Sequence, residues 1–64
     1  MPQQVWEDVK KDLDEAEKRL AEAKEYLKAL EEAGEEVGAL RDEITALEAK
    51  IQRWRQVLRR RGIE

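Results

Sequence analysis

The sequence predicts an all-α protein: an antiparallel helical hairpin, coiled-coil-like in its packing, that assembles into a four-helix bundle. The first supporting observation is composition. Charged residues make up 45% and aromatic residues 5% of the 64 residues, and Ala, Glu, Lys, Leu and Arg dominate, as in long helices and coiled coils. The second is that apolar residues recur at alternating steps of three and four in two stretches. The third is Gly34, which separates the stretches at a change in their phase. We expect one domain, residues 1–64.

The first helix is expected over about residues 2–33. Pro2 suits a first helical turn, where its missing N–H is not needed. The apolar positions follow the heptad repeat of a coiled coil, written abcdefg, in which a and d face the neighbouring helix. The a positions are Trp6, Leu13, Leu20 and Leu27, and the d positions are Val9, Ala16, Ala23 and Leu30.

The turn is expected at about residues 34–36. Gly34 follows the last apolar residue of the first stretch, where a left-handed, helix-ending conformation is usual. The alternative is one continuous helix with a three-residue irregularity in its repeat. We favour the turn, because Gly34 and Gly38 together would cost such a helix roughly 2 kcal/mol relative to alanine. Their GxxxG spacing lies among glutamates, which argues against a membrane dimer motif.

The second helix is expected over about residues 36–61, with Glu35 and Glu36 at its start. Three consecutive arginines occupy its last turn, where the helix dipole favours cations, and Gly62 ends it. The a positions are Val37, Ile44, Ile51 and Leu58, and the d positions are Leu40, Leu47 and Trp54.

Folding at the turn pairs the two heptad rows in antiparallel layers, and both central alanines then face isoleucines, which suits an interdigitated core. In the last layer, the guanidinium of Arg61 meets the indole of Trp6, an interaction worth at most about 1 kcal/mol when exposed. The layers are Leu30 with Val37, Leu27 with Leu40, Ala23 with Ile44, Leu20 with Leu47, Ala16 with Ile51, Leu13 with Trp54, and Val9 with Leu58.

Charges favour the antiparallel arrangement. In a parallel homodimer the g residues would face e residues of like charge, whereas in the antiparallel hairpin e faces e. A neighbouring set of e contacts would be repulsive, and the sequence leaves the choice between the two sets open. The attractive set is Glu31 with Arg41, Lys24 with Glu48, and Glu17 with Arg55.

Self-association is expected, because a 64-residue chain without Cys or His has no disulfide and few metal sites to support a small core. Apolar residues outside a and d widen the apolar stripe beyond a two-helix contact; they are Val5, Tyr26, Ala33 and Val57 at g, and Ala39 and Ala46 at c. We expect a homodimer of hairpins; a three-hairpin assembly and a dimer of straightened, exchanged helices are the alternatives. The residues predicted to form the core and self-association surface are Trp6, Val9, Leu13, Leu20, Leu27, Leu30, Leu40, Ile44, Leu47, Ile51, Trp54 and Leu58.

The residue types argue against catalysis. The chain has no His, Cys or Ser, its lone Thr45 falls on the outer side of a helix, and no Asp or Glu occupies an a or d position. A phosphate-cradling glycine loop is also absent from the sequence. We therefore expect no enzyme, cofactor or metal. No apolar run approaches the roughly 18 residues that span a membrane, and no targeting signal is present, so we expect a soluble, cytoplasmic protein.

A basic segment near the C-terminus offers a second interpretation, a small coiled-coil binding module. Its cations could contact nucleic acid or an acidic partner. Nucleic acid is the less favoured partner, because the hairpin brings this end beside the acidic start of the first helix. The residues of this alternative site are Arg53, Arg59, Arg60 and Arg61.

The whole chain resembles de novo designed helical bundles. The resemblance is one of style, carried by regular Leu, Ala and Ile rows and by Glu, Lys and Arg filler such as residues 15–24, and it includes no family motif. Departures are Gly38, Thr45, the Gln3–Gln4 start and the three arginines. In size the chain is also similar to natural helical-hairpin dimers of plasmid copy control, without a motif match. The resemblance implies a structural, self-assembling bundle protein.

Overall fold

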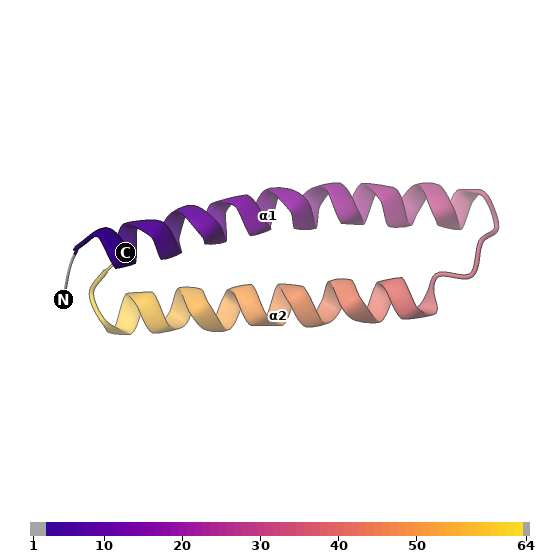
Figure 1. Ribbon diagram of the computed structural model, residues 1–64. Helices are drawn as coiled ribbons and strands as arrows, with labels where there is room; N and C mark the ends of the chain where they lie inside the picture. The colour runs from indigo at the N-terminus through magenta and orange to yellow at the C-terminus, as the bar shows by residue number, and fades with distance from the viewer. Residues whose placement is uncertain (1–2, 64) are drawn as a thin grey trace.

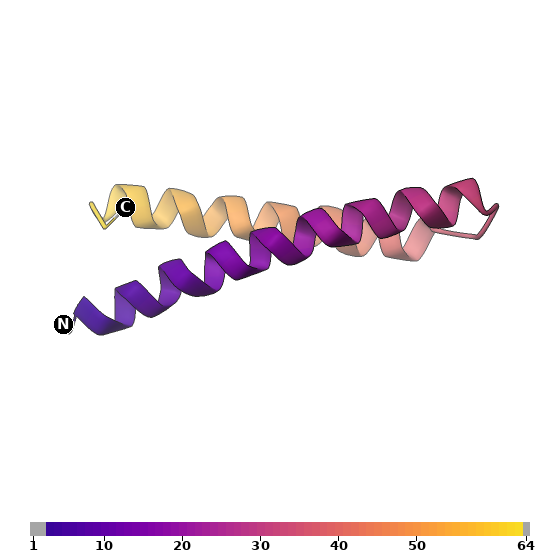
Figure 2. The same ribbon diagram turned by 90° about the horizontal axis from the view of Figure 1, so that it is seen from above.

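The computed structural model describes residues 3–63, which form two α-helices, α1 (Gln3–Glu32) and α2 (Gly38–Arg60). The helices lie side by side and antiparallel (Figure 1), and seen from above they cross at a shallow angle (Figure 2). The rod measures 49 × 16 × 13 Å. The predicted all-α hairpin is thus confirmed, and no continuous helix runs through Gly34. Pro2, predicted to start the first helix, lies outside the described residues.

The first helix ends at Glu32, one residue before the predicted end, and Ala33 and Gly34 form the turn. Gly34 has a φ of 80°, the left-handed region that favours glycine. Its N–H donates to the carbonyl of Glu31 at 3.0 Å, and the N–H of Glu35 donates to the carbonyl of Leu30 at 2.9 Å. This pair of bonds is a Schellman motif, which satisfies carbonyls that the helix end leaves without partners.

The second helix begins later than predicted, at Gly38 instead of Glu35 or Glu36. The chain uses residues 35–37 in non-helical conformation to cross from one helix to the other. A carboxylate oxygen of Glu36 accepts the N–H of Gly38 at 2.6 Å, so Glu36 serves the helix start from outside it. The carbonyl of Val37 accepts the first helical bond, from Arg41 at 2.8 Å, which keeps Val37 in register with the a positions that follow.

The far end of α2 repeats the motif found after α1. Gly62 has a φ of 72°, its N–H donates to Arg59, and the N–H of Ile63 donates to the carbonyl of Leu58, both at 3.0 Å. Lys10 of α1 also donates to the carbonyl of Ile63 at 3.5 Å, a long bond. The chain end is therefore held over Leu58, which has no exposed surface.

The core follows one row of the heptad repeat. Each of the five buried side chains among the described residues occupies an a position. The central cluster is Leu20, Ile44 and Ile51, with Ala16, Ala23, Leu27 and Leu40 packed around it. The d positions are only partly covered, so the two helices turn their a rows toward each other and leave their d rows near one side of the hairpin. The five buried residues are Leu13, Leu20, Ile44, Ile51 and Leu58.

Candidate functional site

The two long edges of the hairpin differ, and the edge formed by e positions is closed by ion pairs. Lys24 and Glu48 approach to 2.6 Å, and nearer the turn Arg41 bonds Glu31. Arg55 completes the row toward the chain ends. These are the pairs that the attractive set predicts. Each exposed pair is worth about 0.2–1 kcal/mol, and together they fix which edge of the hairpin is closed.

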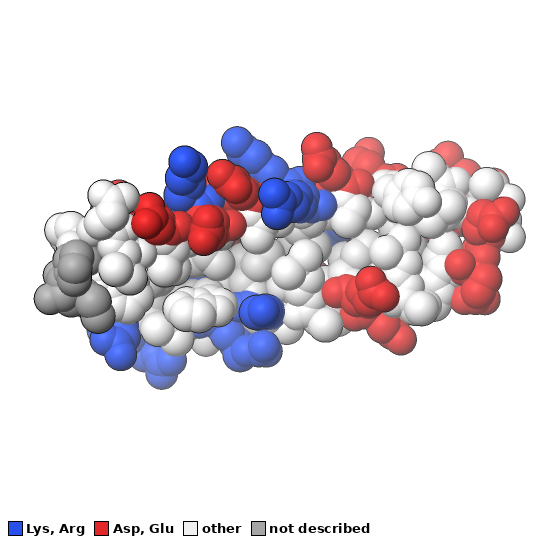
Figure 3. Space-filling view, in the orientation of Figure 1, with Lys and Arg blue, Asp and Glu red and all other residues white. Residues whose placement is uncertain are grey.

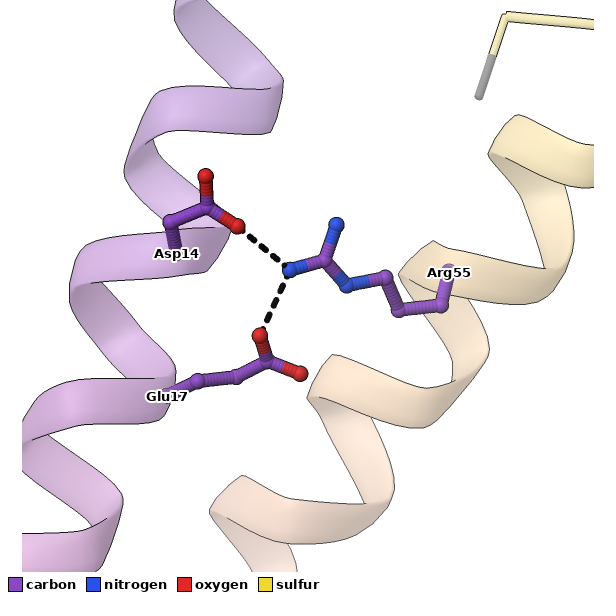
Figure 4. Close-up of polar contacts among 3 residues, drawn as sticks. All are labelled: Asp14, Glu17 and Arg55. Atoms are coloured by element: carbon purple, nitrogen blue, oxygen red, sulfur yellow. Dashed lines mark hydrogen bonds and ion pairs between the residues drawn. The ribbon is translucent and has the colours of Figure 1, made fainter.

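Arg55 is the most enclosed of these cations, with its side chain 15% exposed. Its guanidinium donates to Glu17 at 2.6 Å and to Asp14 at 2.9 Å, so one nitrogen of α2 joins two carboxylates one turn apart on α1 (Figure 4). The hydrogen bond to Glu17, and then that to Asp14, raises the pKa of Arg55 above its usual value. Sequence reasoning missed Asp14; its spacing of three residues from Glu17 was the available signal.

The opposite edge is open. We call the open face the surface formed by the d and g positions of both helices. Leu47 is 36% exposed and Trp54 is 40% exposed, although the heptad repeat places both in the row that faces a neighbouring helix. Tyr26 and Val5 are exposed at g positions. A band of uncharged side chains runs along the rod between charged edges (Figure 3). The apolar g positions were the sequence signal for this second face.

A shallow groove of about 290 Å³ lies in the open face. It is almost wholly apolar, with Asp12 and Lys50 as its charged residues, and the Trp54 indole forms one wall. Trp54 also lines a second hollow, with Lys50, Arg53 and Val57. Trp54 and Lys50 therefore border both hollows of this surface. The residues that line the groove are Val9, Asp12, Leu13 and Ala16 of α1, and Leu47, Lys50, Ile51 and Trp54 of α2.

Charge is distributed unevenly along the rod. The half that contains the turn, residues 22–48, carries nine acidic and three basic residues. The half that contains the chain ends, residues 3–21 and 49–63, carries ten basic and six acidic residues. Over α2, basic side chains gather toward the chain ends and acidic side chains toward the turn (Figure 3). The hairpin is thus electrically polar along its length.

The structure divides the predicted residues into three groups. Five are buried, as given above, and Leu47 and Trp54 are exposed in the single hairpin. Trp6, Val9, Leu27, Leu30 and Leu40 are partly buried. In the terminal layer, the guanidinium of Arg61 lies over the indole of Trp6, 5.7 Å from the ring centroid, as the layer pairing predicts.

The basic residues of the alternative site are exposed. Within residues 3–63, Arg53, Arg59, Arg60 and Arg61 form no ion pair with an acid. The acidic start of α1 was expected to compensate this end, but in the described chain its carboxylates pair only with Arg55 and Lys10. The structure brings the four arginines to one end of the rod without placing a groove among all of them.

Residues 3–63 contain no grouping of side chains typical of a catalytic or metal site. No polar or charged residue there is buried, and no cluster of three or more His, Cys, Asp or Glu could hold a metal ion. Neither described helix has an apolar stretch that would cross a bilayer. No protein-family model matches the chain, and neither a curated protein nor a solved structure shows significant similarity to it.

Proposed function

We propose that this chain is a structural, self-assembling helical-bundle protein without catalytic activity, similar in kind to designed bundles. Two hairpins associate through their open faces into a four-helix bundle. The observation that carries this proposal is the exposure of Leu47 and Trp54 at d positions, beside an apolar groove that the hairpin leaves uncovered. Four-helix bundles pack their helices around a shared core of a- and d-type positions, so a second hairpin would cover the exposed d positions.

The accessible surface supports the proposal. The chain exposes 5,081 Å². A compact monomer of its mass, 7.5 kDa, exposes about 4,250 Å² by the usual scaling of area with mass. The excess of about 800 Å² equals what one partner buries in a standard protein interface. The single hairpin therefore has the surplus area that a dimer requires.

Trp54 contributes a large exposed apolar area beside the groove. An indole side chain presents roughly 250 Å², so an exposed fraction of 40% leaves about 100 Å² in water. Covering this area is worth about 2.5 kcal/mol per chain at 25 cal/mol per Å². A dimer covers two such residues. In the isolated hairpin this area of Trp54 stays exposed, and the core has five buried side chains among the described residues.

Sedimentation equilibrium between about 1 and 100 μM tests self-association, and we expect twice the 7.5 kDa chain mass at the upper end. Trp54→Lys should weaken the dimer more than tenfold while the helical circular dichroism remains. Gln52→Lys is the matched control, because Gln52 is an exposed b-position residue two places away. A monomer at 100 μM would refute the proposal, and three times the chain mass would replace the dimer with a trimer of hairpins.

The basic end supports a second candidate, a binding module for nucleic acid or an acidic partner. Its supporting observation is the group of exposed arginines that lack acidic partners in the described chain. Titration with labelled duplex and single-stranded DNA at low and moderate salt tests it. Binding that persists at moderate salt and disappears on replacing Arg59, Arg60 and Arg61 with Gln would favour this function. Binding that vanishes at moderate salt would mean unspecific attraction.

A further inference from the structure

We infer that two hairpins meet with their turns at opposite ends, so that α2 packs antiparallel against α2 of a second copy and Glu43 of each copy pairs with Lys50 of the other. The inference rests on the proposed self-association and assigns its surface, orientation and specificity-determining residues. Four observations support it. They are the two ways in which the open faces can stack, the uneven charge along the rod, the self-complementary sequence of α2, and the absence of ion pairs at Glu43 and Lys50 within residues 3–63.

Stacking two open faces with a two-fold axis allows two arrangements. With the axis along the rod, both turns lie at one end and α1 of each copy covers α2 of the other. With the axis across the rod, the turns lie at opposite ends, and each helix covers its own equivalent in antiparallel orientation. The choice between the two therefore decides whether α2 meets α1 or another α2.

Charge selects the second arrangement. With both turns at one end, two halves with a large acidic excess would face each other, and so would two halves with a basic excess. With the turns at opposite ends, each acidic half faces a basic one. The contrast is strongest along α2 and the residues before it: residues 35–48 hold five acids and one base, and residues 49–63 hold six bases and no acid. Complementary halves stabilise the complex and guide its association.

The open face of α2 is also self-complementary in sequence. Reversal about a point between Ala46 and Leu47, near the middle of α2, exchanges Glu43 with Lys50. The same reversal sets Trp54 against Ala39, a c-position residue at the margin of the open face, with Leu40 next to it. A large indole thus meets a small residue and a leucine, as interdigitated packing requires. Ala46 and Leu47 meet each other across the axis, again small against large.

Glu43 and Lys50 are available for this contact. Both are exposed, and neither forms an ion pair with another residue of 3–63. They are seven residues apart on one helix, about 10.5 Å at 1.5 Å per residue, so they cannot pair with each other within a chain. Lys50 lies beside Trp54 in both hollows of the open face. A carboxylate from a second copy would reach it at the rim of the apolar contact.

A charge-exchange cycle tests the pair. Glu43→Lys and Lys50→Glu should each weaken the dimer by roughly tenfold, because two attractions per dimer become two repulsions. The double variant E43K/K50E keeps the composition of the chain and should return the dissociation constant to within about threefold of the original. Asp42→Lys is the matched control, since it makes the same charge change one residue away, at an f position outside the d and g rows, and should leave the dimer unchanged.

Orientation is measured directly with one spin label per chain at Glu35→Cys, since the sequence has no other cysteine. Gly38, the first residue of α2, lies about 13 Å from the midpoint of the α2 contact, and Glu35 lies beyond it in the turn, so two labels should be more than about 25 Å apart. Turns at one end would place the labels within about 20 Å. A dimer with the short distance, or a double variant no tighter than the single ones, would overturn this inference and leave the proposed self-association intact. A monomer would overturn both.

Discussion

Replacing Leu58 with alanine tests the asymmetric core most directly. Leu58 has no exposed surface, and the carbonyl of Leu58 also accepts the hydrogen bond that folds the chain end over it. Truncating a fully buried leucine to alanine lowers the free energy of unfolding by about 2–5 kcal/mol, because apolar burial is lost and a cavity remains. We expect about 3 kcal/mol for Leu58→Ala. A chain of this size has a total stability of roughly 3–10 kcal/mol, so the variant should be unfolded in part without denaturant.

Leu47→Ala is the matched comparison, because it makes the same chemical change in the same helix. Leu47 is 36% exposed and borders a groove that is already open, so its truncation leaves no closed cavity. We expect a cost of about 1 kcal/mol in the isolated hairpin. The two substitutions therefore differ by roughly 2 kcal/mol for a physical reason visible in the structure: one side chain lies inside the a row and the other lies at the open face.

Urea denaturation followed by far-ultraviolet circular dichroism measures both costs, at the lowest protein concentration that gives a signal and again at 100 μM. At low concentration the midpoint should fall about three times as far for Leu58→Ala as for Leu47→Ala. At high concentration the cost of Leu47→Ala should rise, because self-association buries this residue in the proposed bundle. Equal costs at low concentration, or a larger one for Leu47→Ala, would refute the assignment of a and d positions to inner and outer sites.

Two further substitution pairs probe the turn and the closed edge. Gly34→Ala should lower the free energy of unfolding by about 1–2 kcal/mol, measured by thermal denaturation, because a φ of 80° strains any residue with a side chain, although no atom lies within 4 Å of the added Cβ. Gly38→Ala should leave the stability nearly unchanged. Its Cβ would meet only the flexible carboxylate of Glu36 at 2.9 Å, while alanine has the better helix propensity. Arg55→Ala should lower the free energy of unfolding by about 1 kcal/mol, and by less at high salt, because salt screens its ion pairs. Arg53→Ala removes the same charge from a residue without an ion pair in the described chain and should leave the stability almost unchanged. A larger loss of stability for Arg53→Ala than for Arg55→Ala would contradict the assigned pairs. Because the pKa of Arg55 is raised in the folded chain, its ion pairs contribute fully to stability at any pH below the ordinary pKa of arginine, and the contribution is lost only above that pKa. These ion pairs should therefore not make the stability vary between about pH 7 and 9.

The ion pairs and the apolar residues have different roles in this hairpin. Each ion pair at the e edge contributes little to stability, but together the pairs hold the charged side chains of that edge in contacts within the chain. The g positions mix apolar Val5, Tyr26 and Val57 with charged residues such as Glu43 and Lys50, and among the described residues those two charges form no ion pair. The e edge of the hairpin is therefore closed by contacts within the chain, and in the proposed bundle the other edge is covered by the helices of a second hairpin.

The sequence by itself determined the all-α class, the hairpin and its register. Alternating steps of three and four leave only one face of each helix for packing, and Gly34 permits the left-handed residue that ends α1. The sequence offered two sets of e-edge partners, and the structure selects the attractive set, with Glu31, Lys24 and Glu17 paired across the helices. These features depend on local spacing, so a linear pattern contains them. The late start of α2 was not predictable in this way, because residues 35–37 are shaped by the gap they must bridge.

Only the tertiary structure decided how deeply each row is buried. A heptad pattern assigns a and d equal standing, since both face the neighbouring helix. In the folded chain the rotation of each helix about its axis exposes Leu47 and Trp54 while Leu58 is sealed. That rotation is a compromise among all contacts at once: the reach of the e-edge side chains, the small alanines of α1 and the bulk of the isoleucines opposite them. It has no local signature in the sequence, and it produces the open face through which we propose that the protein assembles.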